Sequence, residues 1–440
     1  MTTFLKKTAK PLALLPLLVF IFTFLGAGIV LDDFYAFPSP VAVLVGIIAA
    51  FLVHPFTTEQ KVATLVAGCG DSKIITMCLI YLLAGGFAVV SKAMGGVDAV
   101  VNLGINTIAI AYFPLGIFLI AAFLSTATGT SVGAIVALGP IAVTLADKSG
   151  ASLPLISGAL LGGSMFGDNL SMISDTTIAA TQSLGCALKD KFKMNVFIAF
   201  PAAVFTVLVL FYLGWNSELT PVVIAKTSFD WMAIVPYVLV VVLALMGINV
   251  FLTLLTGTIL AGIIGYFSGV FTGITFAQKL YEGFTGMTDI FLLSMLTGGL
   301  AAMVAKAGGI DYLLDQIKKR IKNKKSAQTG IGVLVGCANL AIANNTVSIV
   351  ITGPIAKQIN EEYGLNNKKT AAILDIFSCI VQGILPYGAQ VLLILSFANG
   401  KIDFLDLISN AWYHLFLLGC TLFAIYSSYW DRGAKRFFGI

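Results

Sequence analysis

Charged residues are scarce in this chain. Of its 440 residues, 11% are Asp, Glu, Lys or Arg, whereas 58% are hydrophobic. A soluble domain has about 25% charged residues, so this composition cannot cover a water-exposed surface. The shortage of charge excludes a soluble globular protein and predicts an all-α polytopic membrane protein. We expect the net charge of +5 in loops and at termini, where it reports topology rather than a nucleic-acid partner.

Cysteine and histidine are scarce where metal or thiol chemistry would need them. The six cysteines form no CxxC motif, and most fall in apolar runs, so we interpret them as unpaired packing residues. His54 and His414 share no metal-ligand spacing with each other or with a cysteine. The sequence therefore predicts no cofactor beyond a coupling ion, H⁺ or Na⁺.

Long apolar runs predict the membrane spans. The first, residues 11–30, follows three lysines and has about 20 residues, more than the 7 to 15 of a signal-peptide core. We interpret it as a span with a cytoplasmic amino terminus, and the polar TTEQK at 57–61 as a return to the cytoplasm. Further spans are expected over residues 41–53, 74–90, 113–146 and 194–213, and near the end over 412–427.

The second half of the sequence repeats landmarks of the first. GGFAVVSKAMGGVD at 85–98 is matched by GGLAAMVAKAGGID at 298–311, 213 positions later, and GPIA at 139–142 recurs at 353–356, 214 positions later. Such ordered coincidences indicate an internal duplication. We expect a first repeat over residues 1–215, a linker over 216–230 and a second repeat over 231–440.

Basic residues are distributed differently after the matching motifs. Six Lys or Arg lie between 318 and 325, whereas 97–113 contains none, and Lys189, Lys191 and Lys193 follow the acidic motif of the first half only. Because cytoplasmic loops are rich in Lys and Arg, the two repeats are predicted to be inverted, with about five spans each and both termini in the cytoplasm.

A polar interruption stands at the same place in each repeat. STATGTS at 125–131 interrupts the run 113–146, and ANNTVS lies at 343–348. A run of about 34 residues is too long for one span of about 20, so we expect broken helices whose polar groups bind a ligand at mid-membrane depth. Close helix packing is the alternative. The candidate ligands here are Thr128, Thr130, Ser131, Asn344, Asn345 and Thr346.

The main candidate site is GDNLSMISDTT at 167–177. Asp168 and Asp175 lie in an apolar segment, 152–183, that we expect to enter the membrane and return as a re-entrant hairpin. Seven residues apart, they would share one helix face or lie across the hairpin turn; helix capping by SDTT is the alternative. Asn169, Ser171, Ser174 and Thr176 are further candidates, as is Gln382, which stands 214 positions after Asp168.

Carboxylates in such surroundings suit cation-coupled transport. In a low dielectric, a carboxylate can exchange a proton for Na⁺ or for an ammonium group, because each cation offsets the same desolvation cost. Asp168 and Asp175 are therefore the candidate Na⁺ ligands. Asp289 and Asp375 also lie near or within apolar runs and are additional candidates.

GDNLSMISDTT, with STATGTS upstream and KDKFKMN downstream, resembles the NhaC-type sodium/proton antiporter family, within the ion transporter superfamily of inverted-repeat carriers. The resemblance covers nearly the whole chain. It implies secondary active transport coupled to H⁺ or Na⁺, with Asp168, Asp175 and neighbouring Ser and Thr as ligands. Many members have GDKLSPLSDTT, with Lys and Pro at the positions of Asn169 and Met172. KAMGGVDAVVNLG and SDTTIAAT are more similar to the amino-acid-transporting branch.

We therefore expect a transporter of the bacterial inner membrane and not an enzyme. It would move a small amino acid, such as histidine or a basic amino acid, by alternating access; Na⁺/H⁺ antiport and a passive channel are alternatives. The lipid bilayer and a small-molecule substrate are the expected partners, and the sequence leaves a homodimer open. An intramembrane aspartyl protease is disfavoured because Met165 stands at the first position of the GxGD signature.

Overall fold

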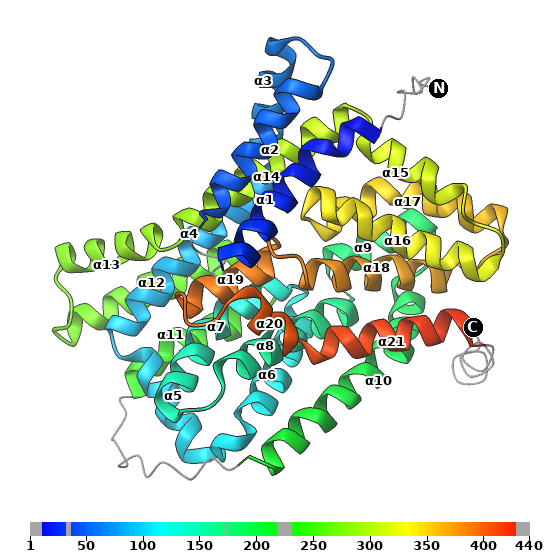
Figure 1. Ribbon diagram of the computed structural model, residues 1–440. Helices are drawn as coiled ribbons and strands as arrows, with labels where there is room; N and C mark the ends of the chain where they lie inside the picture. Colours follow the sequence, from blue (N-terminus) through cyan, green and yellow to red (C-terminus); the bar gives the residue numbers. More distant parts are fainter. Residues whose placement is uncertain (1–10, 32–36, 173, 218–230, 428–440) are drawn as a thin grey trace.

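The computed structural model describes residues 11–31, 37–172, 174–217 and 231–427, and these residues form helices and no strands. Seven of the described helices are long and apolar enough to cross a membrane. Figure 1 shows them with their connections. The all-α polytopic membrane class predicted from composition is confirmed. The linker is described only at 216–217, and the amino-terminal lysines and the tail beyond 427 lie outside the described residues.

Helices fill the first half of the chain. They are α1 (Leu15–Leu31), α2 (Ser39–Val53), α3 (Thr58–Cys69), α4 (Ser72–Ala93), α5 (Gly96–Thr107), α6 (Phe113–Thr128), α7 (Ser131–Ser149), α8 (Leu153–Leu170), α9 (Asp175–Leu184) and α10 (Leu188–Trp215), with 3-10 turns at Pro11–Leu14 and Ile110–Tyr112.

The second half has a similar series of elements. They are α11 (Trp231–Leu245), α12 (Val250–Phe267), α13 (Gly273–Thr285), α14 (Thr288–Lys306), α15 (Gly309–Lys318), α16 (Lys324–Ile342), α17 (Asn345–Glu362), α18 (Asn367–Gly383), α19 (Ala389–Ala398), α20 (Phe404–Ser409) and α21 (Trp412–Tyr426). Helices occupy each segment predicted as a span.

Both predicted helix breaks are confirmed. Between α6 and α7, Gly129 adopts a φ of 74°, and Thr130 accepts a hydrogen bond from the backbone N–H of Gly133. Between α16 and α17, Ala343 adopts a φ of 54° although it is not glycine, and Asn344 accepts from the backbone of Val347. A left-handed residue that ends one helix, followed by a capping side chain that begins the next, accounts for each break.

The short helices α3 and α13 were not predicted. Residues 58–61 of the polar segment form the first turn of α3, which begins at a capping box between Thr57 and Gln60. The return of this segment to the cytoplasm stays a prediction. Thr272 and Thr275 form a capping box at the start of α13. Neither helix is long enough to span a bilayer, which needs about 20 residues.

The main hydrophobic core joins the two halves of the chain. Phe118 and Leu161 from the first half belong to the same buried cluster as Ile376 and Leu393 from the second. Helix α18 packs against α8, α9 and α10, and α19 packs against α7. The helix pairs α8–α9 and α18–α19 are thereby placed among helices of both halves (Figure 1). Within each pair the two helices make few contacts with one another and pack on different neighbours, so each pair is a helix interrupted by a turn rather than two helices that fold back along each other. We call these pairs the first and second hairpin, after the path expected for 152–183.

Candidate functional site

A cavity of about 450 Å³ lies where the helix breaks meet the first hairpin turn. Its walls come from residues 128–132 and 344–346 at the two breaks, from Asp168 and 174–176 at the hairpin, and from the starts of α4 and α12. Ligand pockets in proteins usually have about 300 to 1,000 Å³. The cavity is therefore large enough for a small solute.

Most of the residues predicted from the sequence lie together around this cavity, although their roles as ligands stay a prediction. Asn169, Ser171 and Gln382 do not line it. The lining residues among the thirteen predicted ones are Thr128, Thr130, Ser131, Asp168, Ser174, Asp175, Thr176, Asn344, Asn345 and Thr346.

The two acids occupy different environments. Asp168 is 5% exposed, lies two residues before the end of α8 and accepts a 3.0 Å hydrogen bond from the Ser131 hydroxyl. Asp175 is exposed and begins α9. Since the chain turns between them, they do not share one helix face. Ser174 makes no side-chain capping bond, whereas Asp175 lies in the first helical turn, where a negative charge is favourable.

A chain of hydrogen bonds connects Asp168 to the second hairpin. Gln390 Nε2 donates to Ser131 Oγ at 3.0 Å, and Gln382 Nε2 donates to Gln390 Oε1 at 3.1 Å. Gln382 Nε2 also donates to the carbonyl of Ala343 at 3.4 Å, at the second break. Sequence reasoning missed Gln390, although it ends the segment ILPYGAQ that matches the acidic hairpin. Gln382 thus lies behind the cavity wall and supports it through Gln390.

Several helices begin at the cavity. The first residues of α4, α7, α9, α12 and α17 all line it. Helix amino termini carry free N–H groups and a partial positive charge, which attract anionic groups. Lys73 also lines the cavity, along with the two carboxylates. Groups of both signs therefore lie around one small volume.

Oxygen atoms dominate the groups that could hold a cation. Among the described residues, no three His, Cys, Asp or Glu side chains are grouped as a metal centre. Asp168 with Ser131, and Ser174 with Thr176 at 2.7 Å, instead offer carboxylate and hydroxyl oxygens, the ligand type that hard cations prefer. This donor set fits Na⁺ as a transported ion.

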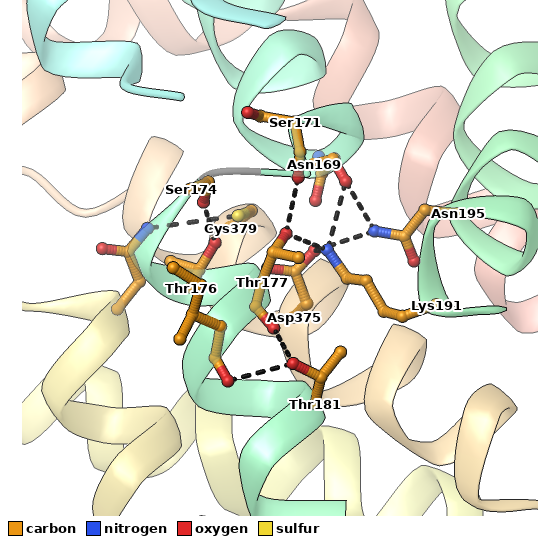
Figure 2. Close-up of polar contacts among 12 residues, drawn as sticks. Asn169, Ser171, Ser174, Thr176, Thr177, Thr181, Lys191, Asn195, Asp375 and Cys379 are labelled. Atoms are coloured by element: carbon orange, nitrogen blue, oxygen red, sulfur yellow. Dashed lines mark hydrogen bonds and ion pairs between the residues drawn. The ribbon is translucent and has the colours of Figure 1, made fainter. Parts of the chain in front are cut away.

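A second polar cluster lies behind the hairpin turn (Figure 2). Lys191 on α10 forms a 2.7 Å ion pair with Asp375 on α18, and both side chains are fully buried. Sequence reasoning treated Lys191 as a cytoplasmic charge within a basic group, and no periodicity signal distinguished it. Of the two additional acidic candidates, Asp375 thus lies next to the hairpin, whereas Asp289 is exposed at the start of α14 and does not line the cavity.

The apolar helices and the polar cavity among them define a multi-pass membrane protein, and sequence comparison identifies its family as one of secondary transporters. The chain belongs to the Na⁺/H⁺ antiporter family, whose sequence model matches residues 3–215 and 216–431.

Three curated relatives cover most of the chain. A malate-2H⁺/Na⁺-lactate antiporter of Bacillus subtilis is 26% identical, over 72% of this chain and 74% of its own. The Na⁺/H⁺ antiporter NhaC of the same organism is 24% identical, over 73% and 77%. The arginine/ornithine antiporter ArcD of Halobacterium salinarum is 24% identical, over 86% and 84%. Among solved structures, the YdaH transporter of Alcanivorax borkumensis is 14% identical, with a TM-score of 0.41 over 83% of this chain and 87% of that one.

Proposed function

We propose that this transporter moves a small amino acid across the bacterial inner membrane by alternating access, coupled to H⁺ or Na⁺. The observation that carries the proposal is the cavity lined by Asp168, Asp175 and Lys73 together with several helix starts. A zwitterion presents an ammonium group to carboxylates and a carboxylate to helix amino termini. Histidine and basic amino acids are the candidates to test first.

The named activities of two relatives also support an organic solute. ArcD is named as an arginine/ornithine antiporter, and another relative as a malate-2H⁺/Na⁺-lactate antiporter. Na⁺/H⁺ exchange without an organic substrate is the second candidate, favoured by the relatives named NhaC. For either function, Asp168 and Asp175 are the proposed cation ligands, and the hydroxyl and amide groups of both breaks complete the site.

We also propose that the halves, 1–215 and 231–440, are duplicated and inverted. Matching contacts support the duplication: Ser125 Oγ donates to the carbonyl of Ser164 at 2.6 Å, and Asn339 Nδ2 donates to that of Ser378 at 2.9 Å. The two donors, Ser125 and Asn339, are 214 positions apart, and so are the two acceptors, Ser164 and Ser378. Inversion would allow one set of elements to move against the other around a fixed site. Cytoplasmic termini and a homodimer stay predictions.

Binding measurements can find the substrate. The purified full-length protein would be heated in the presence of each of the twenty amino acids, with and without Na⁺. A ligand of the folded state raises the unfolding midpoint. We expect stabilisation by histidine or a basic amino acid; stabilisation by Na⁺ alone would favour the antiporter alternative.

Transport in proteoliposomes separates the two functions. We expect uptake of the labelled amino acid driven by an H⁺ or Na⁺ gradient, with loss of coupled uptake in Asp168→Asn and Asp175→Asn. Asp289→Asn is the matched control, because Asp289 is an acid at a helix start that does not line the cavity. Na⁺-dependent proton movement with no amino-acid uptake would overturn the amino-acid proposal and leave Na⁺/H⁺ exchange.

A further inference from the structure

In the buried ion pair next to the first hairpin, Lys191 makes two hydrogen bonds in addition to its contact with Asp375. Lys191 Nζ lies 2.7 Å from Asp375 Oδ2, and it also donates to Thr177 Oγ1 at 2.5 Å and to the carbonyl of Asn169 at 3.3 Å. An ammonium group has three donors. All three donors of Lys191 therefore have an acceptor, and two of these acceptors belong to the hairpin.

Asn195, one helical turn after Lys191, repeats this pattern. Its Nδ2 donates to the carbonyl of Asn169 at 2.7 Å and to Asp375 Oδ2 at 2.8 Å. The carbonyl of Asn169 lies in the last turn of α8, where backbone acceptors have no partner within the helix. A cation at this end is also favoured by the helix dipole. Two side chains of α10 therefore satisfy one helix end (Figure 2).

The contacts enclose the turn that carries the site. Thr177, which accepts from Lys191, donates its hydroxyl to the carbonyl of Ser171 at 2.9 Å. Asn169 follows Asp168 directly in the chain, and Thr177 follows the lining residues 174–176 directly. Lys191 is absent from the cavity lining, but it contacts the backbone or side chain next to the lining residues on both sides of the turn.

The second hairpin has no such cluster. The positions 214 residues from Lys191 and Asp375 are Leu405 and Leu161, and the position matching Thr177 is Val391. Leu161 and Val391 are fully buried. Leu405 is 56% exposed, so it does not take the buried place of Lys191. The buried positions that match Asp375 and Thr177 are apolar, so the second hairpin folds without an ion pair at the matching place.

We propose that Lys191, Asp375 and Asn195 are positioning residues for transport: they fix the α8–α9 turn so that Asp168 and residues 174–176 face one cavity. This inference rests on the proposed function for the site, whereas the ion pair is a contact of the structure whatever the function is. Lys191 and Asn195 contact the turn directly, and Asp375 on α18 acts on it through these two side chains of α10.

A double substitution tests the proposal without leaving a buried charge unpaired. Removing one partner alone leaves an uncompensated charge, whereas replacing both with apolar residues of similar volume is often tolerated. In Lys191→Met/Asp375→Leu, the carbonyl of Asn169 still accepts from Asn195 and Thr177 still donates to Ser171. We expect a folded protein with an unchanged unfolding midpoint, at least a tenfold higher KM for the coupling cation, and faster hydrogen exchange at 170–178.

The chain supplies a matched control on the same two helices. Asp190 on α10 and Lys368 on α18 form a 3.0 Å ion pair in which neither side chain is fully buried. For Asp190→Asn/Lys368→Met we expect unchanged KM and unchanged exchange at the hairpin. An equal increase in KM in both double variants would mean that transport depends on an ion pair between α10 and α18 in general, rather than on the contacts with the first hairpin. This result would overturn the proposal.

A third variant, Asn195→Ala, tests the proposal if Lys191→Met/Asp375→Leu does not fold. Asn195→Ala keeps the ion pair and removes one donor to Asn169, so we expect a several-fold higher KM in a stable protein. A folded Lys191→Met/Asp375→Leu or Asn195→Ala variant with wild-type KM and wild-type exchange would contradict the positioning role. If the wild-type protein transports neither ion nor amino acid, the proposed function fails, and the hydrogen-exchange comparison still decides whether the cluster holds the turn.

Discussion

The first and second hairpins differ in the residues that they carry near the cavity. The first carries Asp168, buried and bonded to Ser131, whereas the second carries Gln382 at the matching position, bonded to Gln390 and Ala343. A neutral amide and a carboxylate have similar shapes, but only the carboxylate carries a negative charge that a proton or another cation can neutralise. One hairpin therefore supplies charge, and the other supports the cavity wall.

The packing beneath the hairpins differs as well. In the first half, α6 and α8 approach so closely that a Cβ on Gly167 would lie 2.4 Å from the Cβ of Ser125 and from the backbone nitrogen of Thr126. In the second half, the side chains of Phe377 and Val381 fill the space between α16 and α18, next to Gly332 and Gly336. Small residues permit close helix contact in membranes, so the charged hairpin has the more closely packed support.

The proposed inversion gives the largest expected difference, because accessibility is all or none. In a cysteine-free background, Lys322→Cys should react with an impermeant thiol reagent from the cytoplasmic side, and Asn102→Cys from the outside. The positive-inside distribution of Lys and Arg is the reason. Labelling of both cysteines from one side would contradict inversion, and sealed right-side-out and inside-out vesicles serve as mutual controls.

The packing comparison predicts unequal effects of one methyl group. Gly167→Ala should destabilise by about 1 to 3 kcal/mol, since the new Cβ meets backbone and the helices must move apart. Gly336→Ala would meet only the Val381 side chain at 3.1 Å, and alanine favours a helix over glycine by about 1 kcal/mol, so little change is expected. Thermal unfolding in detergent measures both, and equal midpoints would contradict the difference in packing.

Ser131, which bonds to Asp168 of the first hairpin and to Gln390 of the second, gives a further test of the comparison. Ser131→Ala removes the donor to Asp168 and the acceptor of Gln390. A hydrogen bond to a charged group contributes about 1.5 to 3 kcal/mol, so the KM for the coupling cation should change about tenfold or more. Ser149→Ala is the control, since Ser149 lies on the same helix and bonds only locally, to Leu145 and Ala151. Identical kinetics in both variants would exclude a role for Ser131.

Much of the fold could be predicted because its signals are local. Low charge and long apolar runs indicated membrane helices, and STATGTS indicated a break that the structure places at Gly129. Capping boxes at α3 and α13 are also local signals, but these helices have 12 and 13 residues and are too short for membrane spans, so long apolar runs do not reveal them. The order of the elements therefore followed from the sequence more readily than the short helices did.

The cavity was predictable in part for the same reason. Residues at the breaks and at the hairpin are polar in apolar surroundings, which identified most of the lining. Lys191 and Gln390 were missed because their importance depends on contacts across the fold: Lys191 pairs with Asp375, 184 positions later, and Gln390 bonds to Ser131 in the other half. A lysine within a basic sequence gives no sign that it is buried.

Coupled transport by Asp168→Asn in proteoliposomes tests the central claim most directly. The amide keeps the shape of the side chain but cannot carry the charge that exchanges a cation. At equal protein incorporation, and with Asp289→Asn as the control, we predict that gradient-driven transport falls to the level of empty liposomes. Transport by Asp168→Asn at the wild-type rate would contradict the claim that the first hairpin supplies the coupling carboxylate.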